Sequence, residues 1–341
     1  MNVSVVIPTY NRGERLGPTL DALLANDTSR LDAVEIIVVD DGSPEPVAPV
    51  VESRVACPPI SLRCIRRPNA GPAAARNTGF RASRGEIVMF LDDDILCPPD
   101  LIRGHVQGHR LWPGSVIYGR CRHAEPEPMT PFFRFFDSLG HDHGRGLLEE
   151  FVEVLTVASG HISAERTSFD SAKGVYCDDL DGAAEEFTLA LRLRDRGIPV
   201  MLATHIVAVH NQSVDIESMC RQAYWHSMGC AEAVTKYPRT LDFPAVRDII
   251  RVNGALAQGD SARQMLGKLL KRLLCVGHSR RALLRFIKVI EWIAPLDTLL
   301  APLYKAALSS YMTMGIRDGL IAFRGPPGPA PGLQESRTSG S

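Results

Sequence analysis

The sequence predicts an α/β protein with a mostly parallel sheet, flanked by helices and followed by an α-helical C-terminal extension. Apolar runs of strand length alternate with helix-like segments over the first 120 residues, and two of these runs end in clusters of Asp. After about residue 214, apolar side chains recur at helical spacing instead. This change of pattern separates an α/β part from a helical part.

The predicted strands are continuous apolar runs, which are typical of strands covered on both faces by helices. The first run is Val3–Ile7, close to the start of the chain, and the second, Val34–Val39, ends at Asp40 and Asp41. In order, we expect strands at 3–7, 34–39, 62–66, 86–91, 115–118, 199–203 and 206–209.

The predicted helices carry apolar residues three or four positions apart. Pro98 and Pro99 suit the first turn of one of them. We expect α/β-part helices around 16–24, 70–82, 98–110 and 183–196, and C-terminal helices near 215–236, 244–257, 261–275, 279–293 and 297–322. Residues 121–155, which are rich in Pro and Phe, are predicted to form an insert that is either flexible or covers the substrate.

The composition fits a globular protein without a polyelectrolyte partner. The 341 residues include 38 Lys and Arg against 39 Asp and Glu, so the net charge is −1 and we expect no nucleic-acid partner. The eight Cys form no CxxC pair, which argues against a zinc ribbon and favours reduced thiols of a cytoplasmic protein. We expect no signal peptide, and no apolar run reaches the roughly 18 residues that span a membrane.

Two acidic clusters stand where strands of the predicted sheet end. Asp40 and Asp41 follow one apolar run, and Asp92, Asp93 and Asp94 follow another. Ligands of open α/β sheets bind beyond the carboxyl ends of the strands. Carboxylates gathered there would repel one another unless a hard cation or hydrogen-bond donors were bound, and Mg²⁺ or Mn²⁺ commonly joins one or two carboxylates to substrate phosphates. The sequence therefore predicts a metal–phosphate ligand at this edge.

Two groups of His are predicted to have no functional role. His105 and His109 lie four positions apart on a predicted helix but lack the Glu of a zinc protease motif, so we expect them at the surface. The run His141-Asp142-His143 has no evident further ligand and is predicted to be a polar loop.

Five motifs in order resemble those of family 2 glycosyltransferases. The last of them, Glu185-Glu186 before a helix, is similar to the Glu-Asp motif of that family. The other four are Val5-Val6-Ile7-Pro8-Thr9-Tyr10-Asn11-Arg12, Val38-Val39-Asp40-Asp41-Gly42-Ser43, Gly71-Pro72-Ala73-Ala74-Ala75-Arg76-Asn77-Thr78-Gly79 and Leu91-Asp92-Asp93-Asp94, which resembles the DxD motif. The resemblance implies a GT-A fold over residues 1–212. The spacing of apolar residues predicts a helical region at 213–324, and the Gly-, Pro- and Ser-rich composition predicts a disordered tail at 325–341.

The resemblance also implies a function and a set of site residues. It implies inverting transfer of a hexosyl or N-acetylhexosaminyl group from a nucleotide sugar, UDP-linked in the first instance and GDP- or dTDP-linked as alternatives. Carried over by position, the donor would be bound by Pro8, Thr9, Tyr10, Asp40, Asp41, Arg76, Asp92 and Asp93, and Mn²⁺ or Mg²⁺ would be bound by Asp94 and His210.

The general base is predicted to be a carboxylate of the Glu-Asp-like motif. Glu186 is the first candidate and Glu185 the second. The family usually has Asp at the position of Glu186, and the longer Glu side chain leaves open which of the two is the base. Either carboxylate would take the proton of the acceptor hydroxyl. Gly160-His161-Ile162-Ser163 stands where the family places a strand on the acceptor side.

The acceptor and the role of the helical region stay open at this point. The acceptor would be a glycan, a lipid-linked molecule or a small metabolite. The stretch 263–288 holds eight Lys and Arg and no Asp or Glu, beside an apolar face. It fits either an interfacial helix in peripheral contact with the inner face of a membrane or a packed helix with a solvated basic face. The alternative function is a catalytically silent, membrane-attached scaffold on the same fold.

Overall fold

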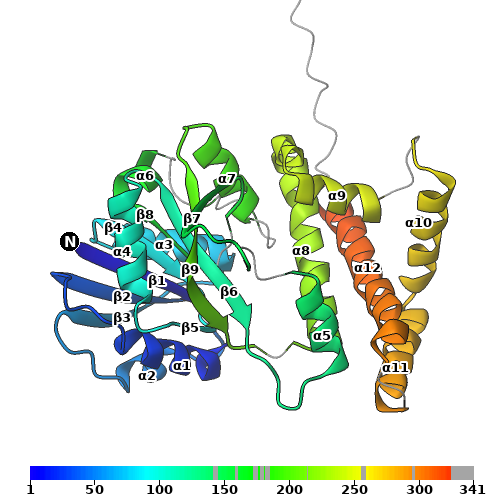
Figure 1. Cartoon of the computed structure of the whole chain (residues 1–341), viewed down its shortest axis with the longest axis horizontal. Coiled ribbons are helices and arrows are strands. Elements are labelled where there is room, and N and C mark those ends of the chain that lie inside the picture. The colour runs from blue at the N-terminus through cyan, green and yellow to red at the C-terminus, as the bar shows by residue number, and fades with distance from the viewer. Residues whose placement is uncertain are drawn as a thin grey trace, which may run out of the picture.

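The computed structural model describes residues 1–140, 145–157, 160–171, 176, 180, 185–212, 214–254, 259–293 and 296–323. It has a central mixed sheet with helices on both faces, and a helical region beside the sheet (Figure 1). The loop at 141–143 and the tail at 325–341, for which the sequence made predictions, lie outside the described residues.

Over the described residues the sheet has nine strands in the order β3-β2-β1-β4-β8-β6-β9-β5, with β7 paired to β9. Strands β3, β2, β1 and β4 are parallel, as expected. Strand β8 runs antiparallel to both β4 and β6, and β5 and β7 run antiparallel to β9. The strands are β1 Asn2–Thr9, β2 Ala33–Asp40, β3 Ile60–Arg66, β4 Ile87–Leu91, β5 Ile95–Leu96, β6 Val116–His123, β7 Phe151–Val154, β8 His161–Glu165 and β9 Val200–His210.

The helices of the α/β part cover both faces of this sheet, so alternate strand residues enter two different cores. Val6 of β1 packs toward α3 and α7, whereas Val5 and Ile7 pack toward α1 and α4. These helices are α1 Gly13–Leu24, α2 Ala48–Glu52, α3 Gly71–Ala82, α4 Leu101–Leu111, α6 Arg166–Ser171 and α7 Glu185–Arg194. Helix α5 Pro131–Ser138 packs against the helical region instead.

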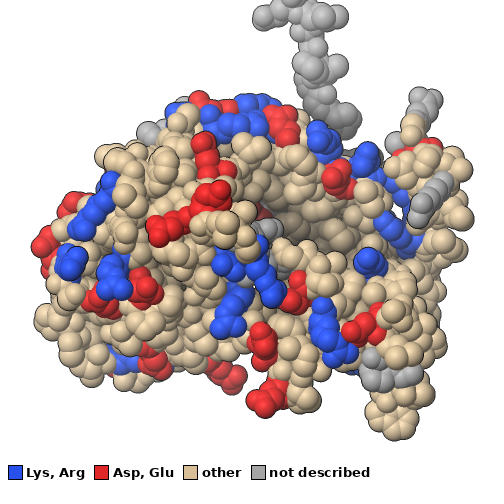
Figure 2. Space-filling model, in the orientation of Figure 1, with Lys and Arg blue, Asp and Glu red and all other residues tan. Residues whose placement is uncertain are grey.

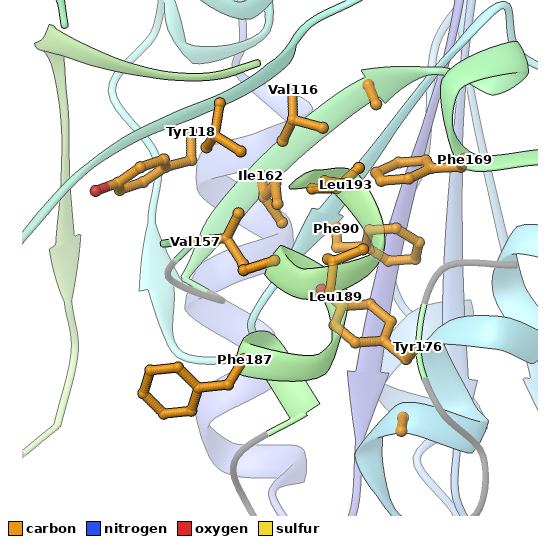
Figure 3. Close-up of a cluster of buried hydrophobic side chains, with 14 of the residues drawn as sticks. Phe90, Val116, Tyr118, Val157, Ile162, Phe169, Tyr176, Phe187, Leu189 and Leu193 are labelled. Carbon is orange, nitrogen blue, oxygen red and sulfur yellow. The ribbon is translucent and has the colours of Figure 1, made fainter. Parts of the chain in front are cut away.

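The core on the α7 side is built around aromatic side chains from several elements (Figure 3). The ring of Phe90, on β4, lies 5.5 Å from that of Phe169 and 5.5 Å from that of Tyr176. Phe187 of α7 belongs to the same core and lies just after the predicted base. This packing fixes the N-terminus of α7 beside the end of β4.

The C-terminal region consists of helices, as predicted. Helices α8 and α12 pack so closely that a Cβ on Gly315 would lie 2.2 Å from the carbonyl oxygen of Tyr224. No described helix is long and apolar enough to span a bilayer. The elements are α8 Ile216–Lys236, the 3₁₀ helix η1 Pro238–Asp242, α9 Pro244–Asn253, α10 Ala262–Leu274, α11 Gly277–Ile293 and α12 Asp297–Ala322.

Two predictions about the fold are wrong. The strands expected at 199–203 and 206–209 are one strand, β9, with a register shift opposite Gly119 and Arg120 of β6. The segment 121–155, expected to be a flexible insert, contains the end of β6, helix α5 and strand β7. The Phe side chains of α5 pack against α12 residues such as Tyr304, so they join the α/β part to the helical region.

Candidate functional site

Most of the predicted donor-binding residues meet at one cavity beyond the carboxyl ends of β1 and β4. In-register pairing of β1 with β2 sets Thr9 opposite Asp40, and pairing of β1 with β4 brings the Asp cluster to the same edge. The cavity has a volume of about 340 Å³. It is lined by Pro8, Thr9, Tyr10, Arg12, Asp41, Asn69, Gly71, Pro72, Ala75, Arg76, Asp92 and Asp93.

The two residues of the first Asp cluster have different environments. Asp41 lines the cavity, and its carboxylate accepts hydrogen bonds from the backbone N–H groups of Ala70 and Gly71, at 3.2 Å and 2.8 Å. Burial raises the pKa of Asp41, and these bonds oppose that rise. Asp40 does not line the cavity: its carboxylate accepts bonds from the Ser43 N–H at 2.8 Å and from Arg66 at 3.0 Å. Asp40 thus holds the loop after β2.

Asp93 ties the loop after β1 to the end of β4. The hydroxyl of Thr9 donates to its carboxylate at 2.6 Å, and Arg12 donates to it at 3.3 Å. Burial raises the pKa of Asp93 to about 6, although the Arg12 guanidinium lowers it. Asn11, with a left-handed φ of 53°, turns the chain between Thr9 and Arg12. Arg12 and Asn69 line the cavity and were not assigned roles from the sequence.

Arg76 connects the cavity to Glu185, the second candidate for the general base. This buried guanidinium donates to Asp92 at 2.8 Å and to Glu185 at 2.6 Å, and it lies over the Tyr176 ring at 5.2 Å. Despite desolvation, the nearby acidic groups raise the pKa of Arg76 above its ordinary value. The ion pair with Arg76 holds the Glu185 carboxylate in place.

Glu186 lies in a different environment from Glu185. Its side chain is 20% exposed, and its carboxylate lies 3.9 Å from Nδ1 of His226 on α8. Burial, together with the neighbouring Glu185 carboxylate, raises the pKa of Glu186 above its ordinary value. A carboxylate with a raised pKa is better suited to accept a proton near neutral pH.

Asp94 and His210 are brought together by the pairing of β5 with β9. Ile95 pairs with His210, and the Asn211 N–H donates to the Asp94 carbonyl at 2.7 Å. Oδ1 of Asp94 then lies 3.5 Å from Nδ1 of His210. Both carboxylate oxygens and this ring nitrogen are buried, and none has a hydrogen-bond partner among the described residues.

These atoms, which lack hydrogen-bond partners among the described residues, fit a divalent cation. Carboxylate oxygen and imidazole nitrogen are suitable ligands for Mn²⁺. Over the described residues there is no group of three or more His, Cys, Asp and Glu that could hold a metal, so the remaining ligands would come from substrate phosphates and water. Arg12 and Arg15 lie 3.5 Å from Oδ2 of Asp94 and add positive charge beside it.

His105 and His109 are buried, so the prediction that they lie at the surface is wrong. Nδ1 of His105 and Nε2 of His109 each lie 2.8 Å from the hydroxyl of Ser163, and Nε2 of His105 lies 2.9 Å from Nδ1 of His161. Burial lowers the pKa of His109 and of His161 to about 4 in each case. The three rings and Ser163 therefore form a neutral network that joins α4 to β8.

Known proteins resemble the chain mainly over its first part. Residues 4–133 match the model described as glycosyl transferase family 2. The uncharacterized glycosyltransferase YfnE of Bacillus subtilis (strain 168) is 36% identical over 119 residues, covering 35% of this chain and 30% of that protein. Validoxylamine A glucosyltransferase of Streptomyces hygroscopicus subsp. jinggangensis (strain 5008) is 33% identical over 132 residues, covering 38% and 31%. The matches thus span about a third of the length of these two relatives.

Solved structures resemble it over a greater length. The mannosyltransferase PcManGT from Pyrobaculum calidifontis, in complex with GDP-Man and Mn²⁺, has a TM-score of 0.57 at 19% identity, covering 92% of this chain and 86% of that one. GalNAc-T7 with UDP, GalNAc and Mn²⁺ has a TM-score of 0.54 at 15% identity, covering 79% and 54%. These likenesses confirm the expected fold. The family resemblance seen in the motifs is confirmed as well: residues 4–133 carry the glycosyl transferase family 2 pattern, within a GT-A fold.

Proposed function

We propose that this protein transfers a sugar from a nucleotide-sugar donor to an acceptor hydroxyl, with inversion at the anomeric carbon and with a divalent cation bound. The observation that carries the proposal is the buried pair Asp94 and His210, whose facing atoms have no hydrogen-bond partner over the described residues. Neither residue lines the cavity, but Arg12, which does line it, lies 3.5 Å from Oδ2 of Asp94. The family pattern over residues 4–133 adds independent support.

The donor would occupy the cavity beyond β1 and β4. Its walls include Pro8, Thr9 and Tyr10 at and just after the end of β1 and Gly71, Pro72, Ala75 and Arg76 of α3. The nucleoside would lie against these walls, with its diphosphate toward Asp94. UDP is the first candidate, and GDP and dTDP are alternatives; PcManGT was solved with GDP-Man and GalNAc-T7 with UDP.

Asp94 and His210 would hold Mn²⁺ or Mg²⁺. Such a cation, when bound, would stabilise the charge that develops on the leaving diphosphate. The guanidinium groups of Arg12 and Arg15, which lie near Asp94, would contribute to the same stabilisation. These Arg side chains are also positioned to balance Asp94 when no phosphate is bound.

Glu186 would act as the general base. Its carboxylate would accept the proton of the acceptor hydroxyl while the hydroxyl oxygen bonds to the anomeric carbon. The bond from that carbon to the diphosphate oxygen breaks, and its electron pair leaves with the nucleotide. Glu185 would instead hold Arg76 in place through the ion pair between them.

Asp94→Asn is expected to remove cation-dependent nucleotide binding. The substitution keeps the shape of the side chain but removes the charge that attracts the cation. Calorimetric titration with UDP, GDP or dTDP in the presence of Mn²⁺ should give an affinity at least about tenfold weaker than that of the unmodified protein, a loss of about 1.4 kcal/mol.

Asp100→Asn provides the matched control, since Asp100 is exposed and precedes α4 outside the cavity. It should bind like the unmodified protein. Equal nucleotide affinity in Asp94→Asn and the unmodified protein, each in the presence of Mn²⁺, would contradict the metal role of Asp94. A silent scaffold would bind no sugar nucleotide in either form.

A further inference from the structure

Helices α10 and α11 expose large apolar side chains at the edge of the molecule that lies away from the sheet (Figure 1). Trp292 is 85% exposed and Leu273 is 64% exposed. Figure 2 shows uncharged surface together with Lys and Arg on the side of the molecule where α10 and α11 lie. We call this surface the outer face; its exposed apolar residues are Met265, Leu266, Leu269, Leu270, Leu273, Val276, Phe286, Val289, Trp292 and Ile293.

The spacing of these residues places them on one side of each helix. On α10, Leu266, Leu269, Leu270 and Leu273 are three or four positions apart. On α11, Phe286, Val289 and Ile293 follow the same spacing. The opposite side of α11 is packed, because Leu284 and Ile287 are buried in a core with Leu300 and Tyr304 of α12. Packing within the fold therefore uses one side of α11 and leaves the outer face uncovered.

Basic side chains accompany this apolar surface. Arg281, Arg285 and Lys288 are exposed on α11. Arg272 of α10 is exposed as well, but it lines a cavity with Thr313 and Arg317 of α12 and does not belong to the outer face. Within the described residues, Arg281 and Arg285 form no ion pair with an acidic side chain, whereas Lys288 pairs with Glu217 at 2.6 Å. The stretch 263–288 contains no Asp or Glu. The outer face is therefore both apolar and positive.

We propose that the outer face binds the surface of a membrane that contains anionic lipids, with α10 and α11 lying in the interface. Apolar side chains of such a helix enter the boundary of the acyl chains, while Lys and Arg contact anionic headgroups. Trp is the side chain most typical of this boundary, and Trp292 is the most exposed one on α11. This proposal goes beyond sugar transfer and does not depend on the donor site.

The charge of the outer face favours lipid over a second copy of the chain. In a twofold-symmetric dimer the same patch meets itself. Arg281 and Arg285 would then approach their own copies without acidic partners on that face, which costs free energy. An anionic lipid surface offers the complementary charge.

The test is co-sedimentation of the full chain with vesicles of phosphatidylcholine alone or of phosphatidylcholine mixed with phosphatidylglycerol. We expect binding to the mixed vesicles, weakened by added NaCl, and little binding to the neutral ones.

The double variant Arg281→Gln with Arg285→Gln should bind the mixed vesicles about 30-fold more weakly, since each charge near the surface is worth about a factor of five. The triple variant Leu266→Ser, Leu273→Ser and Trp292→Ser should lose at least about tenfold.

A matched triple variant controls for general loss of exposed apolar area. Val55→Ser, Leu148→Ser and Leu155→Ser change side chains that are 85%, 96% and 72% exposed and lie outside α10 and α11. This control should bind vesicles as the unmodified protein does. Absence of binding to mixed vesicles would overturn the proposal. So would a dimer measured by light scattering that is lost in the outer-face triple variant but kept in the control, because a second copy would then cover the face.

Discussion

Replacing Glu186 by Gln is expected to lower kcat by about 10²–10⁴-fold while leaving the fold and donor binding intact. Gln has nearly the same shape as Glu but cannot accept the proton of the acceptor hydroxyl. The Glu186 side chain is partly exposed and has no role in the ion pair of Arg76, so little stability should be lost. Steady-state kinetics with a sugar nucleotide that the protein turns over measure kcat. Calorimetric titration with the same donor measures donor binding separately.

The pH dependence of the unmodified protein gives a second readout of the same residue. A general base works only when deprotonated, so kcat/KM should rise with pH as the Glu186 carboxyl loses its proton. Because burial and the neighbouring Glu185 raise the pKa of Glu186, this rise should lie above the value of about 4.3 of an ordinary Glu. In Glu186→Gln the rise should disappear.

Glu185→Gln is the matched comparison on the same turn of α7. This variant weakens the ion pair with Arg76, so its main effect should be a lower unfolding midpoint in urea. The assignment of the base to Glu186 would be wrong if Glu186→Gln kept full kcat while folded Glu185→Gln lost it.

Arg76→Met is expected to destabilise the protein by about 3–5 kcal/mol. Met fills a similar volume, but it leaves the carboxylate of Glu185 buried without its cation and removes the partner of Asp92. The contact of the guanidinium with the Tyr176 ring is also lost. The free energy of unfolding from urea denaturation, measured by circular dichroism, gives the loss directly.

Arg81→Met provides the control on the same helix. Arg81 is exposed near the end of α3, and its guanidinium donates only a long bond of 3.4 Å to Thr78. Its loss should change stability by no more than about 0.5 kcal/mol. A similarly small change for Arg76→Met would show that the buried ion pairs do not stabilise the fold.

The sequence predicted the strands that carry the site because their apolar runs are uninterrupted. Strands β1, β2 and β4 lie at the predicted places, each extended or shortened by a few residues. Strand β9 was predicted as two strands because of the polar Thr204 and His205. In the structure the Thr204 hydroxyl and Nδ1 of His205 contact backbone carbonyls of Glu149 and Glu150, so these side chains are accommodated without a break in the strand.

Only part of the site could be predicted from the sequence, and the reason is geometric. Neighbouring residues at a strand end point in different directions, so Asp40 and Asp41 do not share one ligand. The pattern of the sequence does not distinguish them; the structure has Asp41 lining the cavity and Asp40 bound to the loop after β2. The pairing of Arg76 with Glu185 joins residues 109 positions apart, which helical or strand periodicity does not reveal.

The His residues of α4 show the same limit. Spacing of four positions places His105 and His109 on one side of a helix, but it does not say which side faces the sheet. Polar residues were expected at the surface, whereas the hydroxyl of Ser163 on β8 pairs with both rings inside the core. A buried partner from a distant strand compensates for the desolvation of these side chains.

The most direct test of the donor site is thermal unfolding of the full chain with UDP, GDP, dTDP and CMP, each with Mn²⁺ and again with EDTA. Binding to the native state raises the midpoint by mass action. We predict a raised midpoint for one nucleoside diphosphate with Mn²⁺ and no such rise with EDTA, which would also identify the donor class. An unchanged midpoint with every nucleotide in the presence of Mn²⁺ would contradict a nucleotide-sugar site between Asp41 and Asp94.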